Sequence, residues 1–191
     1  MSAIATDASR AVRGSSGAGL ARAWLTSYTA IWTATLSAAL LIALCGAPLE
    51  QPTRQLLGLR LTPQVNPPPD LAHVLALAAH NIPIAAWPLL LGVMGAHRHR
   101  LARKIADAVL AGCILANTVP VGAALGAYGP PLLPYIPQLP LEWAGLALGA
   151  SAWLVQRRRA LGVREGLLCL ALIACVLLCA ATLETVAVPH R

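Results

Sequence analysis

Five long apolar runs, separated by short basic segments, decide which fold class this 191-residue chain can adopt. Hydrophobic residues make up 58% of the chain and charged residues only 11%. That is too little charge for the surface of a soluble domain of this length. A helix needs about 20 apolar residues to cross the hydrocarbon core of a bilayer, and most of these runs have such a length. The sequence therefore predicts an all-α fold, a polytopic bundle of transmembrane helices.

The apolar runs and their boundaries predict a single transmembrane domain over residues 23–188. Residues 1–22 are small, polar and basic, and we expect them to form a flexible cytoplasmic tail. The first run is too long for the core of a signal peptide. Residues 48–70 are predicted to be an extracytoplasmic loop, which either lies on the membrane surface or caps the bundle, and Asp70 is a good N-cap for the next helix. The predicted spans are 23–47, 71–96, 105–128, 141–156 and 166–188.

The positions of the basic residues predict the orientation. Eleven cations fall on one side if the spans are as above: Arg10, Arg13, Arg22, Arg98, Arg100, Arg103, Lys104, Arg157, Arg158, Arg159 and Arg164. Only Arg54, Arg60 and Arg191 fall on the other side. The positive-inside rule then favours an inside N-terminus and an outside C-terminus. The chain lacks phenylalanine and has one lysine, which is typical of a GC-rich genome, so we expect a multi-pass protein of a bacterial cell (inner) membrane.

Two asparagines lie deep inside predicted spans, and each is soon followed by a proline. Asn81 precedes Pro83 and Asn117 precedes Pro120. At 1.5 Å per residue, Asn81 lies about 15 Å from the outer end of its helix, and Asn117 lies at a similar depth. Amides at this depth must face protein or water. They predict either a clamp, in which the two side chains bond to each other, or a polar site for a small substrate or ion.

Small-residue patterns occur in the third and fourth predicted spans. Glycines at a spacing of four allow helix backbones to approach closely, either within the bundle or between molecules. The residues are Gly122, Gly126, Gly145 and Gly149.

Several ionisable residues are predicted near the outer ends of the spans. Glu142 follows Pro140 in the first turn of a helix, where a carboxylate is favoured by the free amides. His73 and Glu184 are expected at a similar depth, and with Glu142 they would make a proton or metal site if they converged. His80 lies two turns from His73, about 10.5 Å away, too far for both to bind one ion. We therefore predict no metal site.

The sequence carries no recognisable catalytic set. It contains no His-Glu-x-x-His motif, no nucleophile and base pair and no glycine-rich phosphate loop. The five cysteines all fall in predicted spans without a Cys-x-x-Cys pair, which argues against zinc and disulfides. No basic surface interleaved with aromatic residues is present, which argues against nucleic-acid binding. We expect neither enzyme activity nor a cofactor.

One family resemblance rests on residues 71–153. Asn81, then Asn117 followed by Gly122 and Gly126, a proline-rich outer turn, and Pro140-Leu141-Glu142 before an alanine- and glycine-rich run are similar to the stage II sporulation protein M family. The chain departs from the family pattern before Glu142, where Gln138-Leu139 stands in place of a His-Gly pair.

The resemblance implies a non-enzymatic membrane scaffold that assembles other membrane proteins into a complex. Asn81, Asn117 and Glu142 would then hold the fold. Besides the lipid bilayer, the expected partner is another membrane protein or a second copy of the chain, bound through residues 48–70 or the small-residue helix faces. The alternative from the polar residues is a small transporter or channel subunit with a mid-membrane site at Asn81 and Asn117.

Overall fold

The structure is a computed structural model that describes residues 3–58 and 70–187. Within these residues it consists of six α-helices and two short 3-10 helices, without a strand, which confirms the all-α prediction. Residues 59–69 of the predicted outer loop and residue 188 of the last predicted span lie outside the described residues. The elements are α1 (Ala3–Cys45), α2 (Ala47–Leu57), α3 (Leu71–Val93), η1 (Ala96–Arg98), α4 (Arg100–Tyr128), η2 (Pro130–Tyr135), α5 (Leu139–Gln156) and α6 (Val163–Ala187).

Four of the helices are long and apolar enough to cross a membrane. They are α1 from Gly19 to Cys45, α3, α4 and α6. This is compatible with a multi-pass membrane protein. Helix α5 has 18 residues and is not one of the four, so a fifth span stays a prediction.

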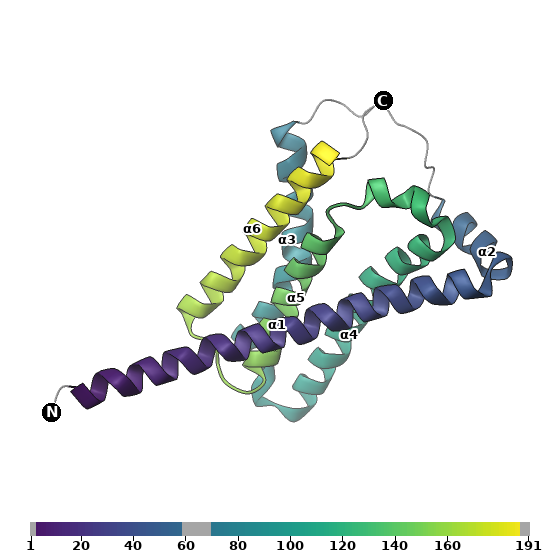
Figure 1. The fold of residues 1–191 in the computed structure, drawn as a ribbon. Helices are drawn as coiled ribbons and strands as arrows, with labels where there is room; N and C mark the ends of the chain where they lie inside the picture. Colours follow the sequence, from purple (N-terminus) through teal and green to yellow (C-terminus); the bar gives the residue numbers. More distant parts are fainter. Residues whose placement is uncertain (1–2, 59–69, 188–191) are drawn as a thin grey trace.

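Helix α5 is the buried centre of the bundle. It packs against α1, α3 and α6, while α1 crosses the other helices obliquely (Figure 1). Small residues around its whole circumference let neighbours approach from several sides, and Ala147, Ala152 and Trp153 are completely buried. A helix that is apolar on all sides belongs in such a position.

The glycines of the predicted packing patterns lie at close helix contacts. A Cβ at Gly122 would collide with the carbonyl oxygen of Thr35 in α1, and one at Gly149 with that of Ala85 in α3. Gly126 meets α1 in the same way as Gly122. Gly145 faces Leu177 of α6, whose Cδ2 would lie 2.9 Å from an added Cβ. Helices α4 and α5 therefore each pack closely, but against different neighbours.

The N-terminal part of the chain differs from the prediction. Helix α1 begins at Ala3, whereas a flexible tail was expected over 1–22. The segment is rich in alanine, the strongest helix former, and has no proline before Pro48, so nothing in it ends the helix.

The first part of the predicted outer loop is also helical. Helix α2 follows Gly46, whose φ of 60° turns the chain back toward α4. The Nε of Arg54 donates a hydrogen bond to the carbonyl of Ala127 at 2.8 Å, and its guanidinium lies 5.3 Å from the ring centre of Tyr128. Helix α2 thus caps the end of α4, which fits one of the two alternatives for this segment.

Candidate functional site

The deep polar residues meet at one small cavity among α3, α4, α5 and α6. Its volume is about 60 Å³, enough for a few water molecules at most. Three of the predicted site residues line it, Asn81, Asn117 and Glu142, each from a different helix. The rest of the wall is mostly apolar: Ile84, Ala85, Trp143, Leu146 and Leu177.

The two asparagines do not form the expected clamp. The Nδ2 of Asn117 donates to the carbonyl oxygen of Cys113, one turn earlier in α4, at 2.7 Å. Over residues 3–58 and 70–187 no hydrogen bond joins the two amides. A bond to the helix's own backbone satisfies the Asn117 donor locally, so an interhelical partner is not required. The prediction of a direct Asn81–Asn117 bond is therefore wrong, although both residues face the same cavity.

Trp143 also lines this cavity, but its indole Nε1 is buried out of reach of solvent and has no hydrogen-bond partner among the described residues. A buried donor without a partner is costly. The polar groups that the cavity offers to a bound water or a small ion are therefore those of Asn81, Asn117 and Glu142.

Both α3 and α6 contribute ionisable residues near Glu142. Glu184 is close enough to Glu142 for their charges to interact, and His73 is close enough to Glu184. Glu184 therefore links Glu142 to His73 in a row of three ionisable residues, with His73 near the start of α3 and Glu184 near the end of α6. In the described part of the chain, no three His, Cys, Asp or Glu side chains could hold a metal ion together.

Asp70 caps α3 as predicted, and its carboxylate accepts a hydrogen bond from the amide of Ala72 at 3.2 Å. His80 is exposed and does not line the cavity.

A second polar contact was missed by the sequence reasoning. Asp107 of α4 accepts a hydrogen bond from Trp153 Nε1 at 2.8 Å and lies 3.3 Å from Nη2 of Arg157. The signal was available, because Asp107 is the only acidic residue in the third predicted span. A carboxylate in an apolar run needs a partner, and Arg157-Arg158-Arg159 is a source of one.

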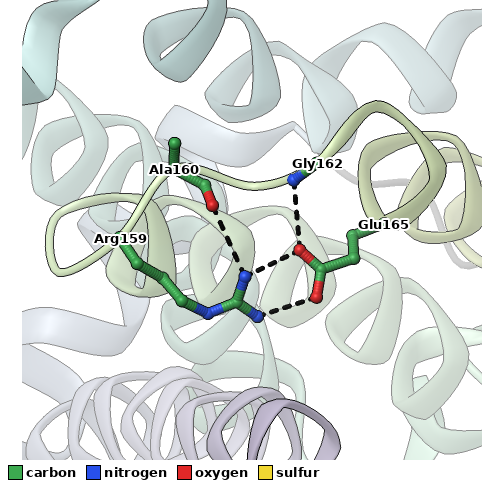
Figure 2. A network of polar contacts seen from close by, with 4 residues as sticks. All are labelled: Arg159, Ala160, Gly162 and Glu165. Atoms are coloured by element: carbon green, nitrogen blue, oxygen red, sulfur yellow. Dashed lines mark hydrogen bonds and ion pairs between the residues drawn. The ribbon is translucent and has the colours of Figure 1, made fainter. Parts of the chain in front are cut away.

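The loop between α5 and α6 is held by a network of its own (Figure 2). The Arg159 guanidinium binds both carboxylate oxygens of Glu165, at 2.7 and 2.8 Å, and the amide of Gly162 donates to the same carboxylate at 3.1 Å. The hydrogen bond to Glu165 raises the pKa of Arg159 above its usual value, so this residue stays charged. The network fixes the position of the loop beside the three consecutive arginines.

Comparisons with known proteins add no assignment. No family model matches the chain, and neither the curated proteins nor the solved structures contain a significant match. The resemblance to the stage II sporulation protein M family stays a prediction.

Proposed function

We propose that the chain is a non-enzymatic integral membrane protein that acts as a scaffold or partner subunit of a membrane complex. In this proposal α5 is a fifth, short span, the N-terminus is inside and the C-terminus outside. Its 18 residues would extend about 27 Å at 1.5 Å per residue, close to the hydrocarbon thickness.

The observation that carries the proposal is the outward face of α1. Thr29, Thr33 and Ser37 follow one another at a spacing of four residues, and all three are exposed. The Thr33 hydroxyl donates to the carbonyl of Thr29 at 2.8 Å, so this hydroxyl brings no unpaired donor into an interface. Small residues at this spacing suit close contact with another transmembrane helix.

The size of the polar cavity also supports a packing role over transport of a solute. A space of about 60 Å³ has no room for a metabolite. Glycine contacts on α4 and α5 hold the surrounding helices close together. Asn81, Asn117 and Glu142 then lie where α3, α4 and α5 meet.

A mild-detergent pull-down tests this proposal. We expect the tagged native chain to recover a stoichiometric membrane partner, or a second copy, and a Thr29→Leu/Thr33→Leu variant to lose it. Ala43→Leu, also exposed on α1, is the matched control and should keep the partner. The proposal fails if the native chain is recovered alone, or if both variants retain the partner equally.

A second candidate function, a small transporter or channel subunit for protons or small cations, is favoured by one observation. The cavity lined by Asn81, Asn117 and Glu142 accepts water-sized species, and Glu184 and His73 continue the row of ionisable groups. Ionisable residues inside a membrane commonly mark ion pathways.

Flux measurements in proteoliposomes separate the two functions. A transporter should carry protons or cations across the membrane, and Glu142→Gln should abolish the flux. Glu50→Gln, on α2 away from the cavity, is the control and should leave the flux unchanged. Absence of flux with the native protein rejects the second candidate.

A further inference from the structure

Two adjoining hollows lie at the end of the bundle where α4 begins and α5 ends. The first is an apolar groove of about 440 Å³ among α1, α4 and α5. Its walls include Ala30 and Ile31 of α1, Leu110, Ala111 and Leu115 of α4, and Trp153 of α5. This groove lies on the α4 side of α1 and does not include Thr29, Thr33 or Ser37.

The second hollow is basic and has a volume of about 670 Å³. Five arginines from α1, α4 and the end of α5 line it: Arg22, Arg103, Arg157, Arg158 and Arg159. Thr26, Leu154 and Arg157 line both hollows, so the basic hollow continues directly into the apolar groove.

The basic hollow has more positive charge than its neighbours neutralise. Arg157 is paired with Asp107, and Arg159 with Glu165. Arg22, Arg103 and Arg158 form no ion pair with any described residue. No acidic residue appears among the described residues that line this hollow. Unmatched arginines in a concave site favour a bound anion such as a phosphate.

We infer that the two hollows together bind one anionic phospholipid, with its phosphate among the arginines and an acyl chain in the groove. Basic pockets between transmembrane helices at the cytoplasmic side bind anionic lipid headgroups in this way. A phospholipid fits better than a partner helix. A single helical turn, about 10 Å across and 5.4 Å high, would fill the whole groove. The inference rests on the proposed orientation in the membrane but not on the scaffold role.

Binding of dioleoyl phosphatidylglycerol to the purified full-length protein, titrated by native mass spectrometry in a mild detergent, tests this site. Dioleoyl phosphatidylcholine is the uncharged comparison, and inorganic phosphate tests for a free anion site. We expect selective binding of one phosphatidylglycerol. An Arg22→Gln/Arg158→Gln variant should bind it about 20-fold more weakly or worse, because each surface arginine contributes appreciably to anionic lipid binding. Arg98→Gln/Arg164→Gln, which removes two exposed arginines outside the hollow, should bind like the native protein.

A second variant blocks the groove and keeps all the arginines. Ala111→Trp places a large side chain into the groove at an exposed position, whereas Ala116→Trp on the same helix does not line it. We expect only Ala111→Trp to weaken phosphatidylglycerol binding. The inference is overturned if phosphatidylcholine binds equally well, if inorganic phosphate competes fully with the lipid, or if both the arginine and the groove variants bind normally. The helical circular dichroism signal and the elution volume in size-exclusion chromatography identify a variant that does not fold. If either the arginine variant or the groove variant fails to fold, the other one decides the result.

Discussion

Asp107 and Trp153 join α4 to α5 through a hydrogen bond from the indole Nε1 to the carboxylate Oδ1 at 2.8 Å. The other oxygen, Oδ2, lies 3.3 Å from Nη2 of Arg157. Trp153 is completely buried, while Asp107 is partly exposed and lines the apolar groove. The contact therefore couples the centre of the bundle to its basic end.

Removing this carboxylate should destabilise the protein. We expect Asp107→Ala to lower the free energy of unfolding by about 1–3 kcal/mol, because it leaves the buried indole donor of Trp153 without a partner. Asp107→Asn keeps an acceptor and should cost less. Chemical unfolding in detergent, followed by circular dichroism, measures both. Adding Arg157→Gln to Asp107→Asn should cause little further loss, and a large additional loss would argue against this ion pair.

Gly149 should tolerate no side chain. Gly149→Ala places a Cβ against the carbonyl oxygen of Ala85, so α3 and α5 must separate. We expect a loss of about 1–3 kcal/mol in stability, measured by thermal or chemical unfolding. Gly112→Ala is the control, since nothing lies within 4 Å of a Cβ there, and alanine should be neutral or stabilising by up to about 1 kcal/mol. Equal effects of the two substitutions would contradict the close α3–α5 contact.

The Arg159–Glu165 pair should contribute little to global stability. Arg159→Gln is expected to change the free energy of unfolding by less than about 1 kcal/mol, since the pair is exposed to solvent. The raised pKa of Arg159 implies that its stabilising effect is fully present below the ordinary arginine pKa and is lost only at still higher pH. Stability of the native protein should therefore show no transition from this residue at neutral or mildly alkaline pH. A pH series of unfolding curves for both forms checks this, and a difference between them that changed near neutral pH would contradict it.

The five-span arrangement predicts which loops share a membrane face. In a cysteine-free background, single cysteines at Leu133 and Gln55 should react with a membrane-impermeant maleimide in intact cells. A cysteine at Ala160 should react only after permeabilisation, because α5 separates it from Leu133. Labelling of Leu133 and Ala160 from the same side would show that α5 does not cross the membrane. If the cysteine at Ala160 reacted in intact cells and those at Leu133 and Gln55 reacted only after permeabilisation, the orientation would be the reverse of the proposed one.

Much of the architecture followed from the sequence because apolar helix-length runs have few alternatives in a bilayer. Helix α3 starts at Leu71 and α4 ends at Tyr128, as predicted. Asp70 is a strong N-cap for α3, and Gly129 is a strong C-cap for α4. At the N-terminus the structure differs from the expected tail over 1–22, since α1 already begins at Ala3. The prediction was also incomplete at α2, where packing of Arg54 against Ala127 and Tyr128 accompanies a short helix that local pattern alone did not predict.

The sequence by itself determined that the chain is helical, apolar and suited to a membrane, because length and hydrophobicity of each run are local properties. It also identified Asn81, Asn117 and Glu142 as unusual, since a polar group in an apolar helix is costly unless it meets a hydrogen-bond partner or water. Only the tertiary structure decided that these three side chains share one cavity while the two amides form no hydrogen bond with each other. It likewise decided that Asp107 reaches Trp153 and that five arginines line one hollow. These relationships depend on how each helix is rotated about its axis and at what angle it crosses its neighbours. Both are set by side-chain packing between segments that are distant in the sequence.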